Sequence, residues 1–377
     1  MFGVILYIMI SIAAVMIAGK VKNSAGYAHY PAGTRQGYIN IICLTALFFV
    51  LFIPSALRIH TGNDYFTYII RFHDAYTGNH IVTEPGFNLI VKAVYTFLDK
   101  EIFLLIFAIF AFLTVFAFIR GMYLQSSDLG LTVFLFMAFG LYFQTYNTVR
   151  YYLALGILLW SMYHVTKGNY VKFVLLVLLA AMFHKTAICA LVFYPFCRLK
   201  WNRITLAILT LGGISGLLFK DAYLALFLKL YPSYVNEEDY LSSGSISWVN
   251  ILRCVAVLAL GIYLYGPVIK KNATLAFYMK LNALALIFYG CFCFVPFASR
   301  IGYYMNISQI LLLPGICTSL EGKKKKILTA LIMAAGTVYF AFFLYKAFGD
   351  VVRVLPYSTW MNYPGSMDGL SYVKVTG

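Results

Sequence analysis

The chain has 377 residues, of which 62% are hydrophobic, 18% aromatic and only 11% charged. Its mean hydropathy of +0.82 is too high for a soluble domain, because the surface of such a domain would have to be largely apolar. A lipid bilayer is therefore the expected solvent. The net charge of +16 does not indicate nucleic-acid binding, since the basic residues lie in short gaps between apolar runs and act there as orientation signals.

Ten apolar runs have about the length that a helix needs to cross a bilayer. They lie near residues 3–19, 38–57, 102–119, 129–146, 150–166, 204–219, 248–266, 275–296, 301–319 and 327–346. The first run has no basic start and resembles the later runs. It is therefore predicted to be a retained helix rather than a cleaved signal peptide.

Two other apolar stretches do not have the length of a single span. The stretch 171–197 is too long, and His184 interrupts it, so it is predicted to form a short hairpin of 171–183 and 186–197. The stretch 86–98 is short and contains a lysine, and it is predicted to be an outer-face or re-entrant helix.

The distribution of charge predicts the orientation of these segments, because Lys and Arg concentrate in short cytoplasmic loops. One set of alternating gaps contains 15 of the 29 basic residues but only two acids, Asp128 and Glu321. These basic residues are Lys20, Lys22, Arg35, Arg120, Lys167, Lys172, Arg198, Lys200, Arg203, Lys270, Lys271 and Lys323 to Lys326. The prediction is an all-α, polytopic transmembrane bundle of about 12 segments, counting the hairpin, with both termini outside.

The predicted domain organisation is a single transmembrane catalytic domain, 1–346, followed by an outer tail, 347–377. Its two longest outer loops are 58–101 and 220–247, and no inner loop is long enough for a soluble catalytic domain. The sequence contains no P-loop, no dinucleotide fingerprint and no Asp-x-Asp pair. Any chemistry is thus expected at the outer face, on a substrate that is already in the membrane.

The seven cysteines predict neither a disulfide framework nor a metal site. All of them fall inside apolar runs, where a small buried thiol is the ordinary interpretation. Cys291 and Cys293 are too closely spaced to form a zinc-binding pair.

The first outer loop is rich in acidic, basic and aromatic residues. It contains Arg58, Asp64, Tyr65, Tyr68 and Glu84. Carboxylates bond sugar hydroxyls and aromatic rings stack on the apolar faces of sugars, so this composition suits a carbohydrate site. The alternative is a solvated loop with interfacial tyrosines.

Two arginines are predicted at outer helix ends. The planar guanidinium of Arg150 matches phosphate oxygens in pairs and keeps its charge, which suits a pyrophosphate. The alternative is an arginine that snorkels to the interface. Arg300 is the second, and it could pair with phosphate or with an acid such as Glu84.

His184 interrupts the stretch 171–197 and can take up a proton near neutral pH, which makes it the first candidate for a general base. The alternative is a histidine that only caps the turn of the hairpin. We expect Arg150, His184 and Arg300 to surround one outward-facing cavity.

Taken in order, these residues resemble the EpsG-like branch of the Wzy-type polysaccharide polymerases over roughly residues 40 to 320. The resemblance rests on Arg58 with Gly62, Asp64, Tyr65 and Tyr68, then Glu84-Pro85 with Phe87, then Arg150 opening a helix, then Phe183-His184 with Ala187, and then Arg300 followed by tyrosine. Two positions depart from the family pattern: Tyr151 stands where glutamine is usual and Thr186 where serine is usual. Thr186 keeps the hydroxyl group, whereas Tyr151 changes the neighbour of the arginine.

The resemblance implies a metal-independent glycosyltransferase of the bacterial inner membrane that uses no cofactor. It would join undecaprenyl-pyrophosphate-linked oligosaccharides at the outer membrane face, giving exopolysaccharide, capsule or O-antigen. Arg150, Arg300 and Arg58 would hold the pyrophosphate that leaves. His184, Asp64 and Glu84 compete for the role of the base. Four tyrosines, together with Glu84, would position the sugars: Tyr65, Tyr68, Tyr303 and Tyr304.

The implied partners are the lipid-linked oligosaccharides and the bilayer, together with a chain-length regulator and a flippase of the same pathway. Two other functions also fit arginines and a histidine at a membrane face. One is a transporter or flippase of lipid-linked sugars, although such proteins usually have internal symmetry, which is not evident here. The other is a membrane glycan ligase or acyltransferase.

Overall fold

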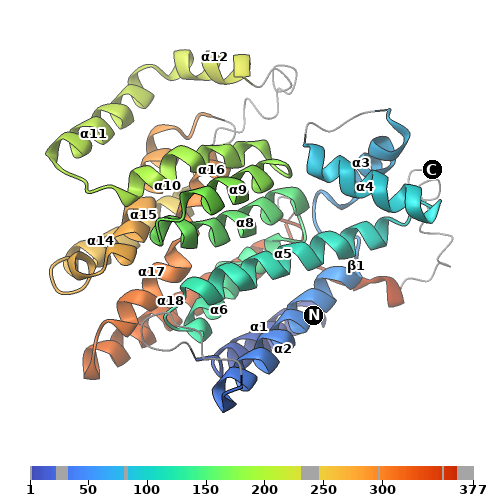
Figure 1. Cartoon of the computed structure of the whole chain (residues 1–377), viewed down its shortest axis with the longest axis horizontal. Coiled ribbons are helices and arrows are strands. Elements are labelled where there is room, and N and C mark those ends of the chain that lie inside the picture. Colours follow the sequence, from blue (N-terminus) through green and yellow to red (C-terminus); the bar gives the residue numbers. More distant parts are fainter. Residues whose placement is uncertain are drawn as a thin grey trace. The chain divides into compact units, whose positions relative to one another are not determined.

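The computed structural model describes residues 2–22, 33–79, 84–230, 246–295, 298–349 and 352–362, which are almost entirely helical (Figure 1). The predicted all-helical class is confirmed, and one pair of two-residue strands accompanies the helices in these described ranges. The chain divides into two compact units. The first consists of Met1–Tyr163, Val171–Ile188 and Leu320–Gly377, and the second of His164–Tyr170 and Cys189–Ser319.

Most elements of the first unit come from the N-terminal half of the chain. Its helices are α1 (Phe2–Ala18), α2 (Arg35–Leu57), α3 (Tyr65–Thr77), α4 (Pro85–Leu98), α5 (Phe103–Gln125), α6 (Leu129–Ala138), α7 (Leu141–Gln144), most of α8 (Val149–Thr166) and of α9 (Tyr170–Ala181), and α18 (Gly322–Lys346). The strands are β1 (Arg58–Ile59) and β2 (Ser358–Thr359), and the short turn of 3₁₀ helix Lys185–Cys189 follows α9.

The helices of the second unit gather around α15 (Ala273–Cys291). The others are α10 (Ala190–Arg198), α11 (Arg203–Leu218), α12 (Lys220–Leu230), α14 (Trp248–Tyr263), α16 (Ala298–Asn306) and α17 (Gln309–Thr318). A buried amide network joins three of them: Gln309 Nε2 donates to Asn282 Oδ1 at 2.6 Å, and Asn282 Nδ2 donates to the Cys254 carbonyl at 3.0 Å. Such bonds hold helices together where water is absent.

In the part of the chain that the structure describes, four helices are long and apolar enough to cross a membrane: α2, α5, α15 and α18. The pair α11 and α12 also passes this test when taken together, but it bends by 87°. The helices α1, α6, α9 and α14 are apolar but shorter. These long apolar helices identify the chain as an integral membrane protein.

Two apolar runs that the sequence predicts as single spans are each broken into two helices. The run 129–146 forms α6 and α7, which are separated at Gly140, where φ is +70°. A Cβ atom at this glycine would also lie 2.5 Å from the ring of Phe343, so only glycine permits the break. The run 301–319 forms α16 and α17, and the hydroxyl of Ser308 between them donates to the Tyr278 carbonyl at 3.2 Å.

Aromatic rings fill the core of the first unit. Tyr7 of α1 stacks on Phe143 of α7 at a centroid distance of 4.2 Å, and Phe143 stacks on Phe340 and Phe343 of α18 at 5.9 Å each. Tyr146 joins this cluster edge-on to Tyr7 at 6.1 Å. Large apolar rings give most of the packing energy of such a core.

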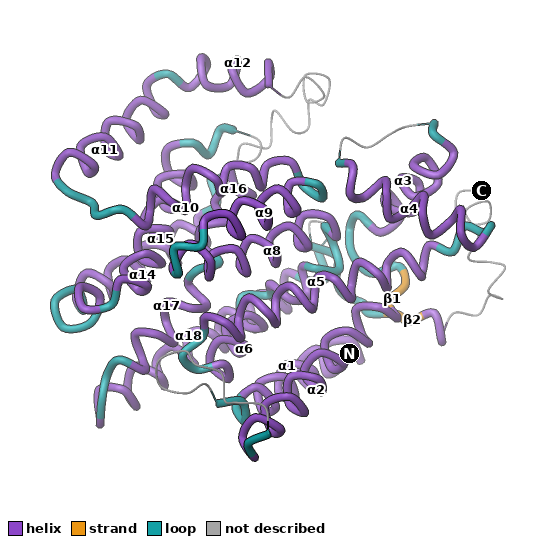
Figure 2. The backbone as a smooth tube through the Cα atoms, in the orientation of Figure 1, coloured by secondary structure: helices purple, strands orange, loops and turns teal. Residues whose placement is uncertain are grey.

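The predicted outer loop 58–101 is largely helical, because it contains α3 and α4, which pack against each other. Its first residues pair with the described part of the C-terminal tail. Arg58 faces Thr359 and Ile59 faces Ser358 in the antiparallel pair β1–β2, drawn as strands in Figure 2. The Gly62 N–H also donates to the Arg353 carbonyl at 2.9 Å. The tail therefore satisfies backbone groups of the segment that leads into α3.

Candidate functional site

The N-terminal end of α8 carries an ion pair that links it to the start of α4. Arg150 Nη1 lies 2.7 Å from Glu84 Oε2, and the side chains are 12% and 8% exposed. Glu84 immediately precedes Pro85, which opens α4. Two charges that are this deeply buried are expected to occur as a pair, because an isolated buried charge is costly. The sequence predicted both residues as candidates, and the structure brings them together.

Aromatic residues surround the arginine of this pair. The guanidinium carbon of Arg150 lies 5.2 Å from the ring centroid of Phe87 and 5.8 Å from that of Tyr68. The Tyr68 hydroxyl accepts a bond from the Arg150 backbone N–H at 3.3 Å. Both rings attract a cation through their faces. Three predicted site residues, Arg150, Glu84 and Tyr68, are thus in one contact group.

Asp64 lies at the start of α3 and contacts the turn before α8. Its backbone N–H donates to Asn147 Oδ1 at 3.1 Å, and the Thr148 hydroxyl donates to Asp64 Oδ2 at 3.4 Å. Asp64 is partly exposed, and Thr148 precedes Arg150 by two residues. A fourth predicted residue therefore borders the N-terminal end of α8.

His184 lies in the break that follows α9, where the sequence predicted a turn. Its Nδ1 and the Thr186 hydroxyl are hydrogen-bonded at 2.7 Å, and its ring meets Tyr151 edge-on at 5.2 Å. The imidazole is 7% exposed. Thr186 and Tyr151, the two positions that depart from the family pattern, both touch this histidine.

A backbone contact joins the turn of His184 to the loop of Glu84. The Gly86 N–H donates to the Met182 carbonyl at 2.9 Å. A Cβ atom at Gly86 would lie 3.0 Å from that oxygen and 3.1 Å from the ring of Phe183, so the close approach requires glycine. Glu84 is two residues before Gly86, and His184 is two residues after Met182, so this contact holds the two side chains in the same region.

Arg58 and Tyr65 are enclosed in the protein. Arg58 is 1% exposed, and its guanidinium carbon lies 4.9 Å from the Phe107 centroid and 5.3 Å from that of Tyr146. Its Nη1 donates to the Ser55 carbonyl, and no acidic side chain pairs with it among the described residues. Burial lowers the pKa of Arg58 from its ordinary value. This environment favours a structural role, and contact of Arg58 with a phosphate stays a prediction.

The faces of the two candidate tyrosines of α3 are covered by protein. Tyr65 stacks on Phe107 at 4.8 Å, Tyr68 packs on Phe72 and Phe107, and each tyrosine is 1% exposed. Stacking of either ring on a sugar therefore also stays a prediction.

The remaining three candidates, Arg300, Tyr303 and Tyr304, lie on α16 in the second unit. Arg300 is partly exposed, whereas Tyr304 is 1% exposed and its carbonyl accepts a bond from the Tyr194 hydroxyl at 2.6 Å. Tyr303 meets Tyr289 edge-on at 6.5 Å. The expected cavity shared by Arg150, His184 and Arg300 stays a prediction, because these residues belong to different units.

Sequence reasoning missed Asn147 and Thr148, the two residues that hold Asp64. Both are small polar residues in a Thr-Tyr-Asn-Thr segment between apolar runs, which is a signal for a polar turn. It also missed Phe107, whose ring touches Arg58, Tyr65 and Tyr68. A phenylalanine inside an apolar run gives no sign of such a position.

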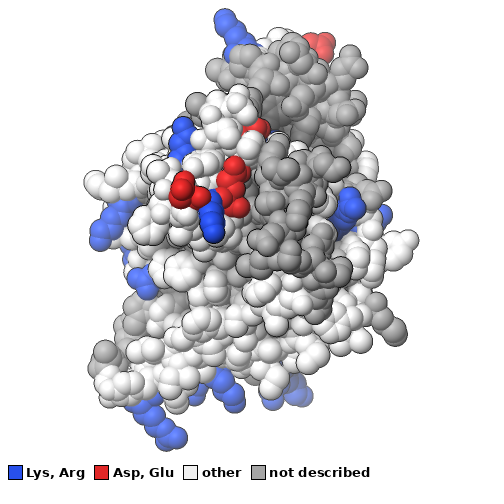
Figure 3. All heavy atoms as spheres, turned by 90° about the vertical axis from the view of Figure 1, so that its right-hand side faces the viewer, with Lys and Arg blue, Asp and Glu red and all other residues white. Residues whose placement is uncertain are grey.

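The region of α3 and α4 carries charges of both signs. On the side of the molecule that Figure 3 shows, carboxylates and basic side chains lie next to one another. One described pair there joins His73 Nδ1 to Glu101 Oε2 at 2.9 Å, with exposures of 22% and 27%. Among the described residues, no group of three or more His, Cys, Asp or Glu side chains lies where it could bind a metal. The groups available for chemistry are thus an arginine, carboxylates, an imidazole and hydroxyls.

The fold and this group of side chains define an integral membrane protein with a polar site at the ends of its helices. The EpsG family model matches residues 41–359, so the chain belongs to the EpsG family. This family is linked to exopolysaccharide biosynthesis. The curated proteins and the solved structures gave no match.

Proposed function

We propose that this chain is a polymerase that joins undecaprenyl-pyrophosphate-linked oligosaccharide repeat units into exopolysaccharide, capsule or O-antigen. The observation that carries the proposal is the buried pair of Arg150 and Glu84 at the N-terminal end of α8, in a member of the EpsG family. Arg150 supplies a permanent positive charge and α8 adds the positive end of its dipole. Both favour an anion at this place.

The anion in the proposal is the pyrophosphate of the donor lipid. The acceptor hydroxyl loses its proton to a base, its oxygen bonds to the anomeric carbon, and the bond from that carbon to the pyrophosphate oxygen breaks. Negative charge develops on the pyrophosphate as it leaves, and a fixed guanidinium stabilises that charge without reorganising. Glu84 holds Arg150 in place through the 2.7 Å contact, and Arg300 is proposed as a second phosphate ligand.

The base is proposed to be His184. Its bond to Thr186 at 2.7 Å fixes the ring, as a general base requires. Glu84 is less suitable, because its Oε2 already bonds Arg150. Asp64 is the alternative base, since it is partly exposed and its Oδ2 accepts only a long hydrogen bond of 3.4 Å from the Thr148 hydroxyl. Tyr65, Tyr68, Tyr303 and Tyr304 are proposed to shape the sugar site, and no metal or cofactor is invoked.

The proposed setting is the bacterial cytoplasmic membrane, with about 12 membrane segments and both termini outside. Cysteines introduced at Lys22, Lys325 and Asn236 test this orientation by labelling in intact cells; Asn236 lies outside the described residues. A membrane-impermeant reagent is expected to reach only the cysteine at position 236. Labelling at position 22 or 325 without labelling at 236 means that the orientation is reversed.

Reconstituted protein tests the proposed reaction. Purified chain in liposomes receives a lipid-linked repeat unit, and the products are separated on a gel. A ladder of lengths that differ by one repeat is the expected result. Unchanged substrate that has moved across the bilayer indicates a transporter, and transfer of a single glycan to another acceptor indicates a ligase. Either of these results refutes the proposal.

A further inference from the structure

A groove of about 410 Å³ runs between the membrane-length helices α2 and α5. From α2 it is lined by Leu44, Thr45, Phe48 and Phe49, and from α5 by Phe112, Phe116, Ile119, Arg120 and Tyr123. Its volume lies within the range of small-ligand sites. Phe49, Phe112 and Phe116 are about half exposed, at 49%, 49% and 47%, so the groove opens toward the surroundings of the helices.

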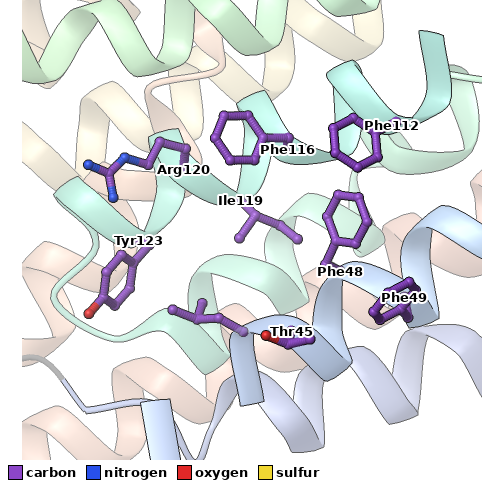
Figure 4. A pocket seen from close by; sticks show the side chains of 9 residues that line it. Thr45, Phe48, Phe49, Phe112, Phe116, Ile119, Arg120 and Tyr123 are labelled. Carbon is purple, nitrogen blue, oxygen red and sulfur yellow. The ribbon is translucent and has the colours of Figure 1, made fainter. Parts of the chain in front are cut away.

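The two ends of the groove differ in chemistry, as Figure 4 shows. Phe48, Phe49 and Phe112 lie together at one end, where Phe48 meets Phe112 edge-on at 5.1 Å. Arg120 and Tyr123 extend their guanidinium and hydroxyl groups toward the other end. The lining therefore suits a molecule with an apolar chain and an anionic head.

This groove is separate from the site around Arg150. Two aromatic residues of α5 contact that site: Phe107 touches Tyr68, and Phe110 packs on Phe87. Phe110, the nearer of the two, and Arg120 are 10 positions apart on one helix, which corresponds to about 15 Å along its axis. The polar end of the groove is thus near the opposite end of α5.

Arg120 has no acidic partner among the described residues, although it is exposed on a helix long enough to span a membrane. An uncompensated charge in such a segment is costly unless it reaches water, a headgroup or a counter-ion. The predicted orientation puts Arg120 on the cytoplasmic side, where anionic lipid headgroups are abundant. A phosphate next to Arg120 would compensate this charge.

We propose that the groove binds one anionic glycerophospholipid of the cytoplasmic leaflet. One acyl chain lies along Phe48, Phe112 and Phe116, Arg120 donates to the phosphate, and Tyr123 borders the headgroup. This inference goes beyond the proposed polymerase function, because the groove takes a lipid that is not a substrate. It does not depend on the reaction at Arg150.

Lipid titrations of the purified full-length chain in detergent, read out by native mass spectrometry, test the proposal. The probes are phosphatidylglycerol and phosphatidylcholine with the same acyl chains. We expect tighter binding of phosphatidylglycerol, and in Arg120→Gln a loss of this preference with about tenfold weaker binding of the anionic lipid. Arg120→Lys should keep part of the preference. Arg203→Gln is the matched control, because it removes an exposed arginine from the first turn of α11 and should change nothing.

A second variant tests the apolar half of the groove. Thr45→Trp adds a large ring at an exposed position, so it fills the groove without disturbing the core, and should weaken binding of both lipids about tenfold. Unchanged lipid binding in Thr45→Trp overturns the proposal. Equal affinities of the wild type for the two lipids overturn it too, and so do equal losses of phosphatidylglycerol binding in Arg120→Gln and Arg203→Gln. Displacement of phosphatidylglycerol by a tighter-binding undecaprenyl pyrophosphate overturns it as well, because the occupant is then the carrier lipid. A change of oligomeric state in Thr45→Trp with intact lipid binding also overturns the proposal, because the occupant of the groove is then a second copy of the chain.

Discussion

Glu84→Gln removes the negative charge from the pair with Arg150 and keeps the size of the side chain. Breaking a fully buried ion pair costs about 3–5 kcal/mol, and this pair is close to that limit, since the side chains are 12% and 8% exposed. The amide can still accept one hydrogen bond, which returns about 1 kcal/mol. We therefore expect the free energy of unfolding to fall by roughly 2–4 kcal/mol.

Denaturant unfolding in mixed micelles, followed by tryptophan fluorescence, measures this loss. The variants are Glu84→Gln, Arg150→Gln and the double variant, which should lose less than the sum of the single variants by about 1.5–3 kcal/mol. Glu101→Gln is the matched control. Glu101 pairs with His73, their side chains are 27% and 22% exposed, and a pair near the surface contributes only about 0–1 kcal/mol to the free energy of unfolding. Equal losses in Glu84→Gln and Glu101→Gln would mean that the buried pair stabilises the fold no more than the exposed one.

Three more substitutions probe His184, the C-terminal tail and the close packing at Gly86. His184→Ala should slow polymer formation by about 10²–10⁴-fold while lipid-linked substrate still binds. A wild-type rate means that the histidine only caps the turn. Thr186→Val should lower the rate of polymer formation by a smaller factor. Tyr357→Phe removes a 2.9 Å bond to a backbone carbonyl of α2, which should lower the free energy of unfolding by about 1 kcal/mol. Because burial raises the pKa of Tyr357 to about 12, above its unfolded value of about 10, the phenolate is disfavoured in the folded state. The advantage of the wild type should then shrink as pH rises from about 10 to about 12, and a constant difference over this range contradicts the assignment. Gly86→Ala should lower the free energy of unfolding by about 1–3 kcal/mol through steric overlap. Gly290→Ala is the control and should be neutral or stabilising, because nothing lies within 4 Å of the added Cβ. Equal effects of the two substitutions would contradict the close packing at Gly86.

The sequence predicted the helices best where an apolar run is long and uninterrupted. The helices α5, α15 and α18 follow such runs, because every backbone group of a segment in lipid must be bonded within the segment itself. Two further runs are each divided into two helices, which hydropathy does not reveal, because it does not register the breaks at Gly140 and Ser308. The first break depends on the φ of +70° at Gly140 and on the ring of Phe343 packed against it, and neither feature can be read from hydropathy.

Long-range partners were the least predictable part of the site. The type and position of Arg150, Glu84, Asp64 and His184 marked each of them as a candidate. A carboxylate pairs equally well with any arginine that approaches it, so composition does not say that Glu84 meets Arg150 across 66 positions. The strand pair of β1 and β2 joins segments that are still further apart, and two-residue strands have no alternating pattern to reveal them.

The most direct measurement is the length of polymer made in liposomes by the wild type, Arg150→Lys and Arg203→Lys. Lysine keeps the charge but loses the planar, paired contact with phosphate. We expect a ladder from the wild type and from Arg203→Lys, and severe loss of the ladder from Arg150→Lys at equal amounts of folded protein. A full ladder from Arg150→Lys would rule out the proposed role of its guanidinium, and no ladder from the wild type with intact lipid-linked substrate would rule out the polymerase.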